Sequence, residues 1–295
     1  MRTRSNPILS FLIGLAILMN TSLICLASAD KETKAIVDAI LRLKDFHEAR
    51  LQEGETKLRY AAFFDFDGTI IKGDITEGDK ELYVGLAEKA VKEALARDYA
   101  GDDGFLALTA KYEELLAQSH EKAYVFVAEQ FANLGNEQKR RLRKLVTEHF
   151  QSTLHKHIFV SSLTYINELS KAGIDVYIVS ASPEVFVKGA VTCLPQIPLR
   201  NMSGINRQRN EKKRLLCPIV NYGQGKILRI RHLISQLPEK AIAIAGFGNS
   251  WSTDGPFLKW IRNEGGISVM INGGKKPNDT KGIWLVRQEK TLREK

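Results

Sequence analysis

Residues 60–71 read Tyr-Ala-Ala-Phe-Phe-Asp-Phe-Asp-Gly-Thr-Ile-Ile, and this stretch decides the fold. Its apolar first half predicts a buried strand. The strand ends abruptly in two acids, Asp65 and Asp67, which flank one aromatic residue. In open α/β sheets, ligands bind in the crevice beyond the carboxyl ends of the strands. Two carboxylates crowded there need a cation or an electrophile to offset their charge, whereas the alternative interpretation is a solvated Asp-x-Asp-Gly turn.

A second predicted strand ends in small polar residues. Residues 174–179 form an apolar run, which is followed at once by Ser180-Ala181-Ser182-Pro183. This ending offers a hydroxyl and backbone N–H groups to an anion. A serine cap on a helix with proline in its first turn is the plainer interpretation, and the two are compatible.

The third and fourth segments supply a cation and another acid. Lys226 follows Gly223-Gln224-Gly225 at the start of a predicted helix, where the helix dipole favours anions. Residues 241–245 predict a third buried strand, which runs into glycines and then Asn249-Ser250, with Asp254 shortly after. Residues 267–271 predict a last strand before a polar tail.

The segment between the first two predicted strands has a different character. Residues 76–152 contain no proline, and their apolar residues recur every three or four positions, which predicts helices throughout. We therefore predict an α/β core, residues 30–75 and 153–295, with an inserted all-helical segment, residues 76–152, which is called the cap segment below.

The four segments, in this order, resemble the motifs of the haloacid dehalogenase (HAD) superfamily, and Lys72-Gly73-Asp74 suits its phosphoserine-phosphatase-like branch. The resemblance implies a Rossmann-like parallel sheet with a helical cap. It implies that Asp65 is the nucleophile and Asp67 the general acid and base. It further implies that Thr69, Ser180, Ala181 and Lys226 bind the phosphate.

The same resemblance implies a Mg²⁺ site formed by Asp65, the main-chain carbonyl of Asp67, and Asp254. The common family form has two acids in the last motif, whereas Asp254 is the only acid between Lys240 and Glu264. Either Asn249 or Ser250 then supports the metal with a neutral oxygen. Mg²⁺ suits such a site because it prefers oxygen ligands and keeps several waters.

These features favour a Mg²⁺-dependent phosphomonoester hydrolase that acts through an aspartyl-phosphate on a small phosphorylated metabolite. The alternative is a non-catalytic protein that binds a phosphorylated ligand on a degenerate HAD scaffold, because the last motif is unusual. The sequence identifies neither the natural substrate nor the oligomeric state.

The first 29 residues predict an exported protein. Arg2 and Arg4 precede a short apolar run, and Ala27-Ser28-Ala29 follows, which is the pattern of a cleaved signal peptide. The apolar run is short for a membrane anchor, so we expect a periplasmic or secreted protein that starts at Asp30.

Removal of this segment lowers the net charge from +9 to +7, since it holds two arginines and no acids. The remaining basic residues are spread along the chain, so we expect no nucleic-acid partner. Cys193 and Cys217 then remain, and they form either a disulfide or two buried thiols.

Overall fold

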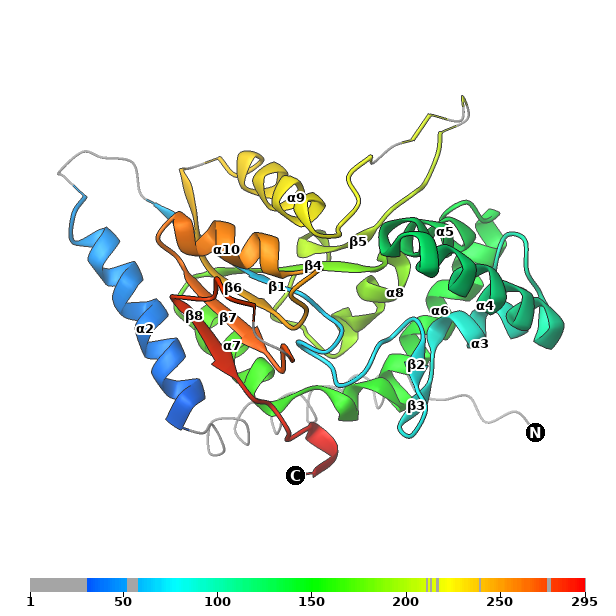
Figure 1. The fold of residues 1–295 in the computed structure, drawn as a ribbon, viewed down its shortest axis with the longest axis horizontal. Coiled ribbons are helices and arrows are strands. Elements are labelled where there is room, and N and C mark those ends of the chain that lie inside the picture. The colour runs from blue at the N-terminus through cyan, green and yellow to red at the C-terminus, as the bar shows by residue number, and fades with distance from the viewer. Residues whose placement is uncertain are drawn as a thin grey trace, which may run out of the picture.

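The computed structural model describes residues 31–51, 58–210, 212, 214, 215, 218–238, 240–274 and 277–294. A six-stranded sheet lies at its centre (Figure 1). Its strands are β1 (Arg59–Phe64), β4 (Asp175–Pro183), β5 (Met202–Ile205), β6 (Ala241–Gly248), β7 (Ile267–Ile271) and β8 (Ile283–Val286). They lie in the order β5-β4-β1-β6-β7-β8, and each neighbouring pair is parallel. The predicted Rossmann-like α/β core is confirmed.

Helices cover both faces of this sheet. They are α2 (Lys31–Glu48) and α7 (Val160–Lys171) on one face, and α9 (Gln224–Ser235) and α10 (Gly255–Asn263) on the other. Strand β1 accordingly has apolar side chains on both sides, with Ala62 and Phe64 toward α2 and α7, and Ala61 and Phe63 toward α9 and α10. This double burial explains why β1 reads as an unbroken apolar run.

The chain between β1 and β4 forms a separate group of helices beside one end of the sheet (Figure 1). These are α3 (Leu86–Lys92), α4 (Gly101–Gln118), α5 (His120–Ala132) and α6 (Asn136–Ser152). The short helix α8 (Glu184–Gly189) follows β4 and packs on α6, where a Cβ on Gly189 would lie 2.2 Å from Val146 Cγ1. Short 3₁₀ helices complete the chain at η1 (Leu154–His157), η2 (Ala190–Thr192), η3 (Leu199–Asn201) and η4 (Leu292–Glu294).

The cap segment also contains a small hairpin that the sequence did not predict. Strand β2 (Gly78–Asp79) pairs antiparallel with β3 (Tyr83–Val84). Such short strands leave no alternating pattern in the sequence. The hairpin depends on close backbone contact, because a Cβ on Gly85 would lie 2.4 Å from backbone atoms of Thr76 and Glu77.

Residues 267–271 are not the last strand, because β8 pairs in parallel with β7 further along the chain. Strand β8 is short, and Trp284 and Leu285 on it are exposed. A four-residue apolar run among polar residues is only weak evidence for a strand. Residues 283–286 become a strand because they can pair with β7.

Two predictions fall on residues outside the described ranges. One is the signal peptide, residues 1–29, and the other is the possible disulfide, because Cys217 is not among the described residues. Cys193 is half-buried, and its Sγ lies 3.8 Å from the Phe150 carbonyl oxygen. A disulfide between the two cysteines therefore stays a prediction. Within the described ranges, no helix has both the length and the apolar character needed to cross a membrane.

The ring of Phe64 supports the centre of the sheet. It stacks on Phe247 of β6 with centroids 4.2 Å apart, and Phe247 in turn lies 4.8 Å from the ring of Tyr165 on α7. We expect Phe64→Ala to lower the free energy of unfolding by about 3–5 kcal/mol, because it leaves a cavity that the sheet cannot close. Phe46→Ala, at a position that is 53% exposed on α2, should cost about 1 kcal/mol or less. Urea denaturation measures both, and equal losses would contradict this assignment.

Candidate active site

The predicted site residues meet at the carboxyl ends of three adjacent strands. Asp65 directly follows β1, and its backbone N–H donates to the Phe247 carbonyl oxygen of β6 at 2.9 Å. Ser180 lies in β4, on the other side of β1. Because these strands are parallel neighbours, segments far apart in the sequence converge in one crevice.

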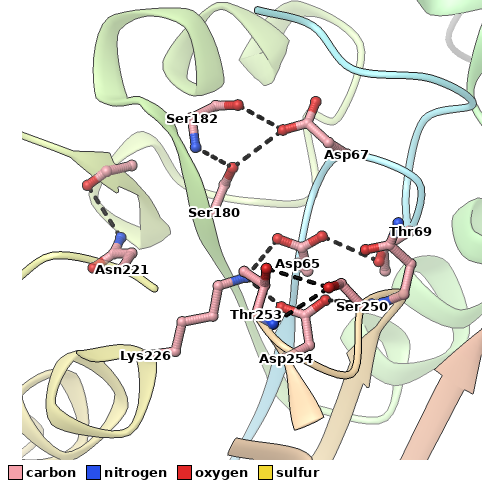
Figure 2. Close-up of polar contacts among 12 residues, drawn as sticks. Asp65, Asp67, Thr69, Ser180, Ser182, Asn221, Lys226, Ser250, Thr253 and Asp254 are labelled. Atoms are coloured by element: carbon pink, nitrogen blue, oxygen red, sulfur yellow. Dashed lines mark hydrogen bonds and ion pairs between the residues drawn. The ribbon is translucent and has the colours of Figure 1, made fainter. Parts of the chain in front are cut away.

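Lys226 lies between two carboxylates (Figure 2). Its Nζ is 2.6 Å from Asp65 Oδ1 and 2.6 Å from Asp254 Oδ1. The side chains of Lys226 and Asp254 are fully buried, and that of Asp65 is nearly so. We call these three residues the buried triad. One buried cation faces two anions, so the triad has room for additional positive charge.

Burial has the largest effect on ionisation in the buried triad. Burial and the charge of Asp254 raise the pKa of Asp65 to about 7, although Lys226 acts in the opposite direction. Burial alone lowers the pKa of Lys226, but the charges of Asp254 and Asp65 outweigh it and leave that pKa raised. Lys226 therefore stays charged, and a further cation beside Asp65 would favour its ionised form.

Glycines and a buried amide position Lys226 at the start of α9. A Cβ on Gly225 would lie 1.8 Å from the Val220 carbonyl oxygen, so only glycine fits there. Asn221 donates from Nδ2 to Ser203 Oγ at 3.2 Å and to the Gly204 carbonyl oxygen at 3.1 Å. These contacts attach the loop before α9 to β5.

Asp254 is held from its other side by the backbone. Its Oδ2 accepts hydrogen bonds from the N–H groups of Asn249 at 2.9 Å and Ser250 at 3.0 Å. It packs against Gly248, where a Cβ would lie 2.4 Å from Asp254 Cβ. Each of its carboxylate oxygens therefore has a fixed direction before any ligand arrives.

Asp67 has separate partners. Its Oδ1 accepts from the Ile75 N–H at 2.8 Å, and its Oδ2 accepts from the hydroxyls of Ser182 at 2.6 Å and Ser180 at 3.4 Å (Figure 2). Burial, followed by the charges of Asp74 and Asp65, raises its pKa well above the ordinary value. Asp67 therefore holds a proton to a higher pH than an exposed aspartate does.

Ser182 is a site residue that the sequence analysis did not select. Its Oγ makes the shortest hydrogen bond to the Asp67 side chain and accepts another from Thr76 Oγ1 at 3.0 Å. The sequence pattern could have indicated Ser182 as a site residue, because it is two residues beyond Ser180 on the same strand and therefore points to the same side of the sheet.

The four residues assigned to phosphate binding divide into two groups. Thr69, Ser180 and Lys226 are fully buried, and their side chains contact the catalytic candidates. Thr69 Oγ1 donates to Asp65 Oδ2 at 3.3 Å, for example. Ala181 instead lines the open cavity. Ala181 is therefore open to a bound phosphate, whereas the side chains of the other three contact Asp65 or Asp67, and their role in phosphate binding stays a prediction.

A cavity of about 440 Å³ lies above Asp65 and Asp67. Its size is typical of small-molecule sites. The core contributes Asn249, Ser250 and Thr253 to its wall, and α4 and α5 of the cap segment contribute Phe105, Leu108, Tyr112, Leu116, Tyr124 and Val127. The cap segment therefore forms one side of the candidate site.

The donor atoms around Asp65 suit a divalent cation that prefers oxygen. Asp65 and Asp254 supply carboxylates, and the main-chain carbonyl of Asp67 accepts no hydrogen bond from the described residues. Across the described chain, no group of three or more His, Cys, Asp or Glu is arranged to hold a metal ion, so neutral oxygens must complete any ligand set. That composition fits Mg²⁺, which binds through one or two carboxylates and keeps waters.

Between the two candidates for the supporting ligand, the geometry favours Asn249. Its side chain lies against the Asp65–Thr69 loop, since a Cβ on Gly68 would fall 2.0 Å from Asn249 Nδ2. Ser250 Oγ is instead engaged within its own loop, 3.0 Å from Ser252 Oγ and 3.3 Å from Thr253 Oγ1.

The family model that matches this chain is that of the haloacid dehalogenase-like hydrolases, over residues 62–259. This match spans more than half of the chain, so the protein belongs to that family. The fold and the order of its motifs agree with this membership.

One solved structure shares the fold at low sequence identity, and another shows a weaker similarity. One is a protein of unknown function from Bordetella pertussis Tohama I, with a TM-score of 0.59 and 13% identity, over 78% of this chain and 99% of that chain. A phosphoserine phosphohydrolase-like protein from Francisella tularensis subsp. tularensis SCHU S4 has a TM-score of 0.46 and 12% identity, over 78% of this chain and 95% of that chain. No curated protein matches the sequence.

Removal of the lysine should expose the electrostatic cost of the buried triad. We expect Lys226→Met to lower the free energy of unfolding by about 3–5 kcal/mol at neutral pH, because two buried carboxylates lose their counter-charge. The raised pKa of Asp65 means that the folded state binds a proton more tightly than the unfolded state. Without Lys226 the pKa of Asp65 rises further, so the loss should be largest above about pH 7, where Asp65 is ionised in the unaltered protein, and smaller below it, where Asp65 is protonated in both proteins.

Chemical denaturation with a metal chelator present, at several pH values, measures this effect. Lys171→Met is a matched control, because Lys171 pairs with Glu168 on the surface of α7 and should cost about 1 kcal/mol or less. A Lys226→Met loss that does not change with pH would contradict the electrostatic explanation.

Proposed function

We propose that this hydrolase is a Mg²⁺-dependent phosphatase that cleaves a small phosphomonoester through an aspartyl-phosphate on Asp65. The observation that carries the proposal is the presence of two differently tuned acids at one cavity. Asp65 is paired with a buried lysine, whereas Asp67 has no lysine partner among the described residues, accepts a hydrogen bond from Ser182, and has its pKa raised by burial and neighbouring charge. Such a division between two carboxyl groups is typical of a nucleophile beside a general acid.

The proposed reaction has two steps. In the first, a carboxylate oxygen of Asp65 attacks phosphorus and the bond from phosphorus to the substrate oxygen breaks. Asp67 gives its proton to the leaving alkoxide, so a neutral alcohol departs. In the second step, water attacks phosphorus and Asp67 takes a proton from it, so that inorganic phosphate leaves and both acids are restored.

Mg²⁺ would be held by Asp65, Asp254 and the main-chain carbonyl of Asp67, with Asn249 in support, and it supplies charge neutralisation and polarisation of the phosphoryl group. The protein's own residues do the rest. Lys226 directs Asp65 and favours its ionised form, and Ser182 directs Asp67. Ala181 lines the cavity and contacts the phosphate of the substrate directly.

The alternative is a protein that binds a phosphorylated ligand without hydrolysis. Release of inorganic phosphate from p-nitrophenyl phosphate, with and without Mg²⁺, separates the two. We expect Mg²⁺-dependent release that Asp65→Asn abolishes, because the amide is not nucleophilic. Asp103→Asn, an exposed acid at the start of α4, is the matched control and should retain activity. Tight binding of phosphate without turnover by the unaltered protein would support the alternative.

Asp67→Asn provides the mechanistic part of the same test. The first step should survive with p-nitrophenyl phosphate, because nitrophenolate leaves without protonation. The second step should slow, because no base activates water. Intact-protein mass spectrometry should then detect a phosphorylated protein that Asp65→Asn removes.

The metal site generates a separate prediction. We expect Asp254→Ala to abolish Mg²⁺-dependent activity, since it removes both a ligand and a partner of Lys226. Asn249→Ala should raise the Mg²⁺ concentration for half-maximal activity by about tenfold or more. Ser250→Ala should raise it less, since the Ser250 hydroxyl is engaged within its own loop. Mg²⁺ titrations of the three variants measure this, and full activity in Asp254→Ala would show that the metal lies elsewhere.

We also infer that the protein is exported, on the basis of its first 29 residues. Mass spectrometry of the protein recovered from outside the cytoplasm should give a chain that begins at Asp30. Recovery of the intact chain in the membrane fraction would contradict this inference.

A further inference from the structure

The cavity wall is strongly acidic. Among the described residues that line it are five carboxylic acids and no lysine, arginine or histidine. Asp65 and Asp67 belong to the reaction itself. The other three, Asp74, Glu77 and Glu113, lie toward the cap segment, and we call them the acid cluster.

The acid cluster is not neutralised by the protein. None of its members forms an ion pair with a lysine, arginine or histidine in the described part of the chain. Asp74 accepts the Thr76 N–H at 2.7 Å and the Glu77 N–H at 2.9 Å on the same oxygen, Oδ1, which leaves its other oxygen available. Burial and the charge of Glu77 raise the pKa of Asp74 to about 6. A cation in the cavity would relieve this repulsion.

The position of the acid cluster is fixed relative to the reacting groups. Ile75, between Asp74 and Thr76, donates its N–H to Asp67 at 2.8 Å, and Gly78 N–H donates to the Asp74 carbonyl oxygen at 2.8 Å. The segment that leads into the hairpin thus places Asp74 and Glu77 beside the general acid, and α4 supplies Glu113 to the same cavity. A group bound there belongs to the alcohol part of the substrate, because Asp67 gives its proton to the oxygen of that alcohol.

Aromatic rings lie beside the acids. Tyr112 donates its hydroxyl to Glu77 and stacks on Tyr124, with ring centroids 6.5 Å apart. Tyr124 lines the same cavity as Asp74 and Glu77, and burial followed by the charges of these acids raises the pKa of its hydroxyl. Neutral tyrosine rings beside carboxylates attract ammonium groups through their faces, including quaternary ones.

We propose that the substrate is the phosphomonoester of a positively charged alcohol that carries no carboxylate, of the phosphoethanolamine or phosphocholine type. This rests on the proposed function, and it names the chemistry of the leaving group. The ammonium group lies among Asp74, Glu77, Glu113 and the two tyrosine rings. A substrate carboxylate would meet only acids on this wall, so a phosphorylated amino acid is disfavoured.

Two matched pairs of esters test the charge requirement. Phosphocholine and 3,3-dimethylbutyl phosphate have the same shape and differ in one positive charge. Phosphoethanolamine and O-phosphoserine differ in one carboxylate. With the unaltered protein and Mg²⁺, we expect kcat/KM to be about tenfold or more higher for the first member of each pair, which corresponds to about 1.4 kcal/mol.

Substitutions in the acid cluster test whether it causes the preference for a positively charged substrate. Glu113→Gln and Asp74→Asn should each reduce the ratio of kcat/KM within the first pair. Glu114→Gln is the matched control, because Glu114 is the next residue on α4, pairs with Lys111 and does not line the cavity. It should leave the ratio unchanged.

Binding to Asp65→Asn protein, measured by calorimetry, provides a readout that needs no turnover. Phosphocholine should bind at least several-fold more tightly than 3,3-dimethylbutyl phosphate. Equal turnover and equal binding within the first pair would overturn the inference and leave the proposed phosphatase intact. Selective binding of phosphocholine without hydrolysis of any ester would overturn the phosphatase and retain the cationic ligand.

Discussion

The ammonium group of Lys226, buried between Asp65 and Asp254, is the interaction on which the site depends. An unpaired charge at that depth would cost several kcal/mol, so the three side chains must be present together. They come from the end of β1, the first turn of α9 and the residue before α10. The requirement for charge pairing therefore fixes the relative positions of three loops. Such a group contributes geometry more than net stability, because desolvation offsets much of the attraction.

Asp67 depends on a second set of constraints, which comes partly from the cap side. Ile75 and Ser182 direct its carboxyl group, and burial holds its pKa above the ordinary value. The segment that supplies Ile75 continues into the hairpin and the cap helices. The protonation of Asp67 and the shape of the cavity are thus linked, because both require the same segment to lie over the ends of the strands. A site opened to water would lose both the raised pKa and the wall that selects the substrate.

The cap segment contributes charge as well as cover. Its helices and the segment before the hairpin place acids and tyrosines on the wall of the cavity that Asp65 also lines. The two walls therefore have different chemistry. The core wall pairs an acid with a lysine and presents oxygen ligands, which suits a phosphoryl group with its metal. The cap wall presents uncompensated negative charge, which suits a cation. This arrangement orients a substrate that has one anionic and one cationic end.

The sequence by itself determined the parallel-sheet core, the helical insertion and the residues Asp65, Asp67, Lys226 and Asp254. The core and the two acids after β1 depend on a local pattern, since a strand buried on both faces reads as an apolar run, and a polar residue just beyond it marks the ligand edge. Lys226 and Asp254 were selected through the resemblance to the HAD motifs. Strand β8 and the hairpin were not predicted from the sequence, because such short strands form only when a neighbouring strand is present to pair with them. Only the tertiary structure decided that Thr69 and Ser180 orient acids, that Ser182 directs Asp67, and that Asn249 lies against Gly68. The physical reason is that these contacts cross between strands and loops, and strand order and backbone approach decide which side chains meet.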